Sequence, residues 1–153
     1  MHLYLIRHAH ALDGDDDAAR PLSPKGRKQC RKLARFLGEA KAFEAEEIWH
    51  SPLRRARETS ALLAKHLKSK AKLTAIAGLR PDDAGDSIIK KLRETSRAVA
   101  VVGHEPHLSA LASLLLAGKA APPRFVFKKC AALRLDRVDG GWAVRWQVSP
   151  ELI

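Results

Sequence analysis

The segment Ala98-Val-Ala-Val-Val102, within a predicted strand over Arg97–Val102, is apolar at every position and constrains the fold more than any other part of the sequence. A strand with one face in water alternates polar and apolar residues, so this unbroken run predicts a strand that is buried on both faces. Such a strand lies at the centre of a parallel sheet with helices on both sides. We therefore expect strands and helices to alternate along the chain.

The remainder of the sequence supports this alternation. Two predicted helices begin with Ser-Pro pairs, Ser23-Pro24 and Ser51-Pro52, which combine a helix cap with a proline in the first turn. The first of them is expected to end at Gly38. Asp139-Gly140-Gly141 predicts a hairpin turn. The expected strands cover residues 2–6, 47–50, 72–76, 125–127, 130–138 and 142–148, and further helices are expected at 86–95 and 107–116.

This order of elements, four β-α pairs followed by antiparallel strands, predicts the fold class. It is typical of a single-domain three-layer α/β/α sandwich with a mostly parallel central sheet, here covering residues 1–153. A chain of this length can bury roughly 68–70% of its unfolded surface. No disulfide or metal is therefore needed to hold the core.

The cysteines and the apolar segments predict where the protein is found. Cys30 and Cys130 lack a nearby partner in the sequence, so we expect buried free thiols, which fit a reducing compartment. Arg7 interrupts the N-terminal apolar run at once, which is unlike a signal peptide. The later run Leu114–Ala117 is far too short to span a membrane. We expect a soluble, cytoplasmic protein, either monomer or dimer.

The formal net charge of +11 predicts attraction for anions. These could be phosphate groups, acidic proteins or nucleic acid. Aromatic residues make up only 5% of the chain, and single-stranded nucleic acids are usually bound by stacking on aromatic side chains. A nucleic-acid partner is therefore not expected.

Ligands of open α/β sheets bind beyond the carboxyl ends of the strands. In this sequence the first strand is followed by Arg7-His8-Ala9-His10, the second by a segment that contains Arg55, and the fourth by Gly103-His104-Glu105. Two histidines and several arginines are thus expected to meet at one rim of the sheet.

These residue types suit phosphoryl transfer. A neutral imidazole can accept a phosphoryl group on nitrogen and pass it to water. Arginine stays protonated and matches phosphate oxygens with a planar fork, and a helix N-terminus adds backbone donors. We expect His8 to be the nucleophile. Its other ring nitrogen must then be held, and a backbone carbonyl in the loop after the first strand could do this, although the sequence does not identify one. His104 would lie across the phosphate, and the other histidines are interpreted as structural or peripheral.

Four motifs resemble the histidine phosphatase superfamily, which has the phosphoglycerate mutase-like fold. Arg7-His8 resembles its Arg-His-Gly signature, and Ser51 to Thr59 resembles its Ser-Pro-x-x-Arg-Ala-x-x-Thr motif. Arg20 to Gly26 is similar to its Leu-Ser/Thr segment, and Val101 to His104 to its second histidine strand. The C-terminal Trp146 to Pro150 resembles the short bacterial, SixA-type phosphohistidine phosphatase branch.

The resemblance implies a metal-independent phosphatase, a hydrolase without cofactors. It implies that His8 accepts the phosphoryl group, that Arg7, Arg55 and His104 clamp it, and that Arg20 is a further contact. Two departures matter: Ala9 replaces the usual glycine, and the general acid is not evident. The candidates for that acid, and for contacts with the substrate, are Asp82, Asp83 and Glu105.

The missing general acid bears on the substrate. A general acid contributes typically 10²–10⁴-fold to catalysis, and alkyl phosphate esters depend on it most. A phosphoramidate such as phosphohistidine needs less help, because its leaving nitrogen can be protonated beforehand. The short chain also leaves no room for a large cap over the site. Both points favour phosphohistidine on a protein, such as a signalling or phosphotransfer protein, over a small phosphorylated metabolite.

Two other function classes remain open. His8, His10, His104 and His107 could ligate Zn²⁺ in a metal-dependent hydrolase, although the nearby arginines would repel the ion. His10 is otherwise interpreted as a rim residue that touches the substrate. The chain could also be a phosphate-binding module that has lost catalysis.

Overall fold

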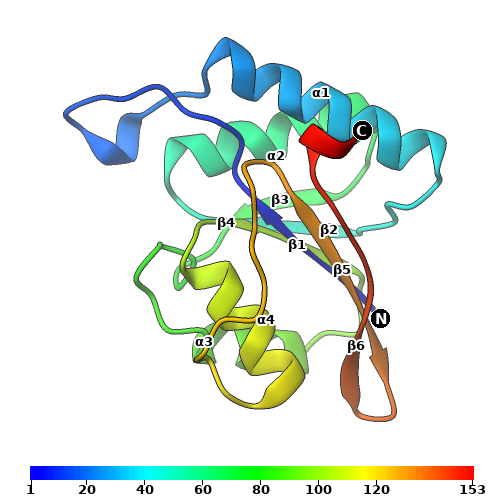
Figure 1. Cartoon of the computed structure of the whole chain (residues 1–153). Helices are drawn as coiled ribbons and strands as arrows, with labels where there is room; N and C mark the ends of the chain where they lie inside the picture. The colour runs from blue at the N-terminus through cyan, green and yellow to red at the C-terminus, as the bar shows by residue number, and fades with distance from the viewer.

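The four parallel strands are each followed by a helix (Figure 1), and the computed structural model describes all residues, 1–153. The parallel strands are β1 (His2–Arg7), β2 (Glu47–His50), β3 (Lys72–Ala75) and β4 (Val99–Gly103). The helices are α1 (Pro24–Glu39), α2 (Arg54–Leu67), α3 (Asp86–Arg93) and α4 (His107–Ala117). The chain ends with strands β5 (Ala132–Val138) and β6 (Gly141–Val148), and short 3₁₀ turns η1 and η2 lie at Asp17–Ala19 and Pro150–Leu152.

The six strands form one sheet in the order β3-β2-β4-β1-β5-β6. The first four strands in this order are parallel, β5 is antiparallel to β1, and β6 is antiparallel to β5. Helices α1 and α2 cover one face, and α3 and α4 cover the other (Figure 1). The predicted three-layer α/β/α sandwich with a mostly parallel sheet is confirmed.

Strand β4 lies between β1 and β2 and is buried at every position. This confirms the interpretation of the apolar run as a central strand. Successive side chains of a strand point to opposite faces of the sheet. Ala100 and Val102 therefore join the core under α1 and α2, and Val99 and Val101 join the core under α3 and α4.

The two cysteines are free and buried, as predicted. Although they are far apart in the sequence, the two thiols lie in the same core cluster, and the neighbouring Cys30 together with burial raises the pKa of the Cys130 thiol. Cys30 lies on α1 and Cys130 directly before β5. The contact therefore joins the helical layer to the antiparallel end of the sheet.

The two Ser-Pro pairs behave differently. Ser23 caps α1 as predicted, because its hydroxyl accepts a hydrogen bond from the N–H of Gly26. The predicted cap at Ser51 is wrong: α2 begins at Arg54, and its N-cap residue Leu53 has no side-chain cap bond. The Ser51 hydroxyl accepts instead from the N–H of Leu53 at 3.2 Å, which holds the turn before the helix.

The predicted strand at Phe125–Phe127 is also wrong, because the segment is irregular. Its backbone carbonyls instead accept hydrogen bonds from the side chains of Ser109, Gln147 and Arg7. Phe127 is buried in the core under α3 and α4. The predicted ends of three helices shift: α1 continues past Gly38 to Glu39, α3 ends at Arg93 instead of Thr95, and α4 ends at Ala117 instead of Leu116. No helix combines the length and the hydrophobicity that crossing a membrane would require.

Gly26 lies in the first turn of α1, at a point where the helix touches the loop after β1. A Cβ atom built there would overlap the carbonyl oxygen of His10 and lie 3.0 Å from its carbonyl carbon. The His10 carbonyl also accepts a hydrogen bond from the N–H of Ser23 at 3.0 Å. Helix α1 and the loop that follows His8 are therefore in direct backbone contact.

We predict that Gly26→Ala destabilises the protein by about 1–3 kcal/mol, because the overlap is with backbone that cannot rotate away. Gly38→Ala, in the same helix, is the matched control: its nearest atom would be 3.8 Å away, and alanine favours a helix interior. Urea unfolding of both variants measures the difference. Equal stabilities for the two variants would contradict the predicted backbone contact.

Candidate active site

The pairing of β1 with β4 brings His8 and His104 together. Arg7 is in register with Gly103, and the next N–H, that of His8, donates to the carbonyl of Gly103 at 2.9 Å. The two histidines follow directly after the paired strands, and their ring centroids are 5.0 Å apart. Both are buried, with His8 4% and His104 1% exposed.

The His8 ring is held in one orientation by a backbone carbonyl, which the sequence alone did not identify. Its Nδ1 lies 2.7 Å from the carbonyl oxygen of Ala9. A carbonyl only accepts hydrogen bonds, so Nδ1 carries the proton and Nε2 presents a lone pair. Burial, and next the nearby charge of Lys129, lowers the pKa of His8 to about 2. The ring is therefore neutral near pH 7, as a nucleophile must be.

His104 faces His8 with unsatisfied hydrogen-bonding groups. Both of its ring nitrogens are buried and have no protein partner. Burial, followed by the charge of Arg55, lowers its pKa to about 3. A neutral imidazole keeps one N–H donor, and a buried polar group without a partner calls for an explanation, such as a ligand. An oxyanion between the two rings would satisfy this donor.

The two predicted clamp arginines reach the same place from different elements. Arg7, at the end of β1, donates through Nη1 to the carbonyl of Phe127 at 2.6 Å, while its Nε is buried and unpaired. Arg55, in the first turn of α2, donates through Nη1 to the carbonyl of Asp17 at 2.8 Å, and its Nε is likewise unpaired. Protein carbonyls thus orient each guanidinium, and further N–H groups are left for an anion.

Asp17 places a carboxylate beside this arginine. Its Oδ2 lies 3.3 Å from Nη2 of Arg55, and its Oδ1 lies 3.1 Å from Nη1 of Arg20. Hydrogen bonding from Arg20 lowers the pKa of Asp17, which is therefore charged near neutral pH. An incoming phosphate competes with this exposed carboxylate for Arg55.

Lys129 is a functional candidate that the sequence reasoning missed. It precedes Cys130, whose N–H donates to the carbonyl of His8 at 3.2 Å. Burial, and then the charges of Arg7, Arg20 and Arg55, lowers the pKa of Lys129 to about 8. A signal was available in the sequence: a strand that pairs antiparallel with the first strand begins at the rim where the first strand ends, so Lys128-Lys129 had to lie near His8.

The last residues of the Ser-Pro-x-x-Arg-Ala-x-x-Thr segment hold the site together. The hydroxyl of Thr59 accepts from the N–H of Ala9 at 3.0 Å and donates to the carbonyl of Arg55 at 2.7 Å. One side chain thereby links the nucleophile loop to the arginine helix. The carboxylate of Glu58 accepts from the N–H of Leu22 at 2.8 Å and from Nε of Arg54 at 2.8 Å, which ties the next loop to the same helix.

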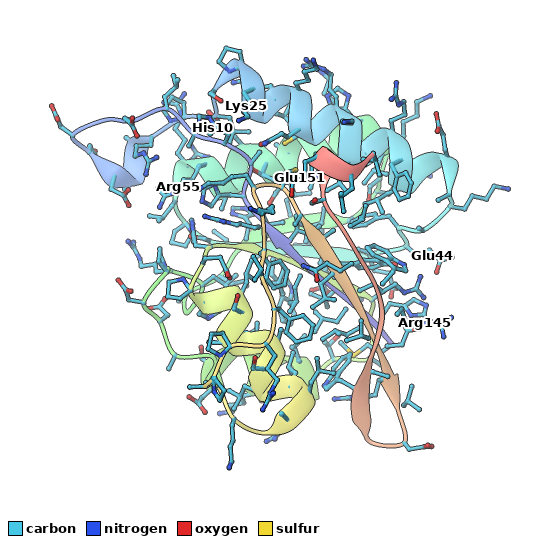
Figure 2. All side chains as sticks on the ribbon, viewed as in Figure 1. His10, Lys25, Glu44, Arg55, Arg145 and Glu151 are labelled. Atoms are coloured by element: carbon cyan, nitrogen blue, oxygen red, sulfur yellow. The ribbon has the colours of Figure 1, made fainter.

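Arg20 and His10 both lie at the rim of the sheet, and both side chains form hydrogen bonds within the protein. Nε of Arg20 donates to the carbonyl of Leu12 at 2.8 Å. Nδ1 of His10 lies 2.6 Å from the hydroxyl of Ser23, beside the start of α1, and Figure 2 shows His10 next to Lys25. Arg20 remains a predicted substrate contact through its charge, whereas His10 supports the cap of α1.

None of the three predicted acids contacts His8 or His104. The carboxylate of Glu105 accepts hydrogen bonds from the N–H and the hydroxyl of Ser109, on α4. Asp83 accepts from the N–H of Arg80 at 2.8 Å, and Asp82 is exposed. The structure therefore ties two of the candidates to other groups and leaves the third in solvent.

The metal-ligand alternative lacks a suitable donor set. No three side chains of the His, Cys, Asp and Glu types come together as a possible ion site. His10 points its Nδ1 toward Ser23, and His107 lies buried at the start of α4, where burial lowers its pKa. The predicted combination of His8, His10, His104 and His107 does not form.

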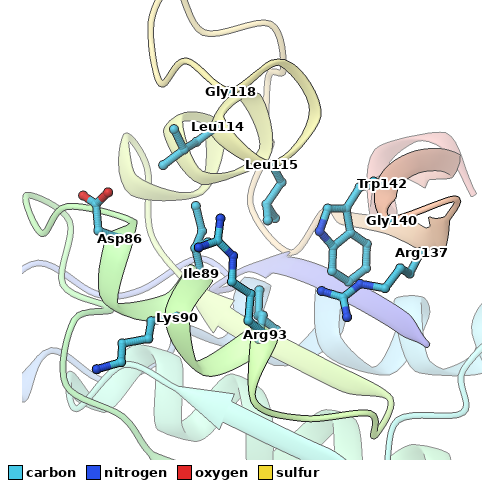
Figure 3. Close-up of a pocket in the computed structure, with 12 residues that line it drawn as sticks. Asp86, Ile89, Lys90, Arg93, Leu114, Leu115, Gly118, Arg137, Gly140 and Trp142 are labelled. Carbon is cyan, nitrogen blue, oxygen red and sulfur yellow. The ribbon is translucent and has the colours of Figure 1, made fainter.

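A further cavity lies away from the two histidines. It has a volume of about 450 Å³ and lies between α3, α4 and the β5–β6 hairpin, as Figure 3 shows. Arg93, Arg137 and Trp142 are among the residues that line it. Since the N–H of Arg137 donates to the carbonyl of Met1, this hairpin lies at the end of β1 opposite His8. The cavity is therefore not part of the site of the two histidines.

Comparison with known proteins supplies the family. The family model of the histidine phosphatase superfamily (branch 1) matches residues 3–87, which include Arg7, His8 and Arg55. Phosphohistidine phosphatase SixA of Escherichia coli (strain K12) is 30% identical over 155 residues, covering 98% of this chain and 94% of that protein. The chain belongs to the histidine phosphatase superfamily.

Solved structures of the superfamily agree with this assignment. The structure of the protein histidine phosphatase SixA complexed with tungstate has a TM-score of 0.87, with 26% identity and coverage of 99% of both chains. An α-ribazole phosphatase from Shigella flexneri has a TM-score of 0.82 with 18% identity, over 98% of this chain and 97% of that one. The second likeness shows the fold alone. The family assignment makes the chain a phosphatase.

We predict that stability falls as the pH drops below about 6.5, the pKa of an unfolded histidine. The pKa values of about 2 for His8 and about 3 for His104 lie below that value, so only the unfolded chain takes up these protons. Stability is complete above pH 6.5 and is lost as the pH falls toward the folded values. Each histidine should cost about 1.4 kcal/mol between pH 7.5 and pH 5.5.

Urea unfolding at these two pH values measures this loss. His8→Asn and His104→Asn should each reduce the difference between pH 7.5 and pH 5.5 by that amount. His66→Asn, at an exposed position on α2, should leave it unchanged. A wild-type pH dependence in all three variants would disprove the burial argument.

We further predict that kcat/KM for p-nitrophenyl phosphate falls as the pH rises above about 8, because Lys129 then loses its charge. Lys129→Arg keeps the charge and should move this fall to higher pH. Lys129→Met should lower kcat/KM at pH 7 by about 10- to 100-fold and abolish the fall. Lys119→Met, at an exposed position, is the control; a wild-type profile for Lys129→Met would remove Lys129 from the site.

Proposed function

We propose that this protein is a phosphohistidine phosphatase that removes the phosphoryl group from a phosphorylated protein through an intermediate on His8. One observation supports the proposal most strongly: the neutral His8 ring is held by the carbonyl of Ala9 with its Nε2 lone pair free. The positive charges of Lys129 and Arg55 act on this ring, and the charge of Arg7 acts on Lys129 beside it. A phosphoryl group carries the complementary charge, and it meets a nucleophile that is ready to attack.

In the first step, the Nε2 lone pair of His8 attacks phosphorus. The bond between phosphorus and the leaving nitrogen breaks, and its electron pair goes to the substrate imidazole, which was protonated on its other nitrogen before the attack and therefore departs neutral. The guanidinium groups and the neutral His104 donor stabilise the charge on the transferring oxygens. The Ala9 carbonyl stabilises the positive charge that develops on the imidazole, because it accepts the Nδ1 proton.

In the second step, water attacks the phosphorus of phospho-His8. The N–P bond breaks and its electrons return to Nε2, so inorganic phosphate leaves and the neutral ring is regenerated. The same cations stabilise both transition states, which is how covalent catalysis divides one difficult displacement into two easier ones.

Two features support phosphohistidine as the group attacked. None of the predicted acids contacts either histidine, since Glu105 is bonded to Ser109 and Asp83 to the backbone of Arg80. An imidazole leaving group can be protonated before the attack and tolerates this arrangement. In addition, residues 76–85, between β3 and α3, form a short loop without a cap domain, so a protein surface can approach the site.

The relatives also support phosphohistidine as the group attacked. The E. coli relative carries the name phosphohistidine phosphatase, and the similar solved structure holds tungstate, a tetrahedral oxyanion like phosphate. A signalling or phosphotransfer protein that is phosphorylated on histidine is therefore the proposed partner. The two buried free thiols support a cytoplasmic location.

The decisive experiment is acid-labile ³²P trapping, with a histidine-phosphorylated protein and a phosphate monoester as rival donors. We expect label on His8 from both donors and faster turnover of the phosphohistidine donor. His8→Ala should abolish labelling and turnover while the far-ultraviolet circular dichroism stays unchanged. Arg55→Ala should lose about 10²–10³-fold in kcat, as for other oxyanion donors.

The outcomes separate the alternatives. His8→Ala with more than a tenth of wild-type activity would refute the covalent mechanism. Faster turnover of the monoester would indicate a small phosphorylated metabolite, rather than a protein, as the substrate. Binding of phosphate without any turnover would identify a binding module that has lost catalysis.

A further inference from the structure

A lysine-lined cleft begins beside the active site. It consists of two adjoining hollows, of about 330 Å³ and about 160 Å³, between α1 and the C-terminal turn η2. The two hollows share Lys25, Gln29 and Glu151, and Figure 2 shows Lys25 and Glu151 on the two elements that form the cleft. We call this feature the lysine cleft; its lysines are Lys25, Lys28, Lys32, Lys128 and Lys129.

The sequence places these lysines on one surface. Lys25, Lys28 and Lys32 are spaced by three and four residues on α1, so they form a stripe along one side of the helix. The buried stripe of α1, at Cys30, Leu33, Ala34 and Leu37, faces the sheet instead. The other two lysines come from the turn before β5. Two segments distant in the sequence therefore supply one band of positive charge.

The lysine cleft is not neutralised by the protein itself. Every ion pair of the structure uses arginine or histidine as its cation, and none uses a lysine. Glu151 is the only acidic residue that lines the cleft, against five lysines. The surface is therefore suited to receive carboxylates from another molecule.

Lys129 connects this surface to the chemistry. It lines the smaller hollow, and its charge acts on both His8 and His104. A chain whose phosphorylated residue reaches His8 therefore has neighbouring residues within reach of the cleft. No aromatic residue lines the cleft, which disfavours stacking with the bases of a single-stranded nucleic acid.

We propose that the lysine cleft binds acidic side chains that flank the phosphorylated histidine of the protein substrate. This inference rests on the proposed function and adds the chemical class of the partner: an acidic protein surface, docked along α1. The lysines act mainly through electrostatic attraction, which speeds association and weakens as salt is added. They determine which phosphoproteins are turned over rapidly, and the lysines other than Lys129 leave the chemical steps unchanged.

The test compares two phosphohistidine peptides of equal length, one with glutamates and one with glutamines around the phosphorylated residue. We expect the wild type to prefer the acidic peptide in kcat/KM by about tenfold or more at low salt. This preference should disappear in 0.5 M NaCl and in the double variant Lys28→Glu/Lys32→Glu. Turnover of p-nitrophenyl phosphate reports the chemistry alone and should change by less than about twofold.

The matched control is Lys90→Glu/Lys91→Glu, which makes the same change in net charge on α3, at exposed positions on the other face of the sheet. It should retain the preference for the acidic peptide. Lys28→Gln/Lys32→Gln, a milder change, should give an intermediate loss, which guards against misfolding of the charge reversal. Equal losses in the α1 and α3 double variants would overturn the proposal.

A binding measurement separates this proposal from the proposed function. The fluorescence anisotropy of a labelled, unphosphorylated acidic peptide should show binding to the wild type and weaker binding to Lys28→Glu/Lys32→Glu. If neither phosphohistidine peptide is turned over while this binding remains, the proposed substrate is wrong and the acidic docking surface stands. Binding that is equal in the wild type and in this variant would refute the docking surface alone.

Discussion

The hydrogen bond from the N–H of His8 to the carbonyl of Gly103 is the contact on which the site depends. It continues the parallel pairing of β1 and β4 by one residue beyond the strands, so His8 and His104 emerge side by side. Strand β4 can hold this position because it is buried at all of its residues and packs on both faces. The apolar core thus sets the distance between two reactive rings.

Positive charge around a neutral ring is the second constraint. Arg7, Arg55 and Lys129 repel one another as well as a protonated His8, and such an arrangement is tolerated only when anions or dipoles compensate it. The protein supplies part of this compensation through carbonyls and Asp17. A phosphoryl group completes it, so the strain among like charges favours binding of the substrate.

The sequence predicted the features that follow from local patterns. The sequence correctly placed the apolar run in a central strand, the cap of α1 at Ser23 and Arg55 in the first turn of a helix. Each of these features depends on residues that are neighbours in the chain. The wrong predictions concern segments whose structure is decided by tertiary contacts. Ser51 holds a turn rather than a helix end, and the carbonyls of Phe125–Phe127 accept hydrogen bonds from side chains rather than from a neighbouring strand. The roles of Lys129 and of Thr59 depend on contacts between segments that are far apart in the sequence, so no short sequence motif predicts them.

The antiparallel strand β5 has a consequence for how the protein is made. The segment that leads into it supplies Lys129, the carbonyl that orients Arg7, and the N–H that binds the His8 carbonyl. His8 leaves the ribosome well before these supports, which follow about 120 residues later in the sequence. A nascent chain therefore carries His8 without its surroundings, and the proposed site is assembled only when β5 joins the sheet.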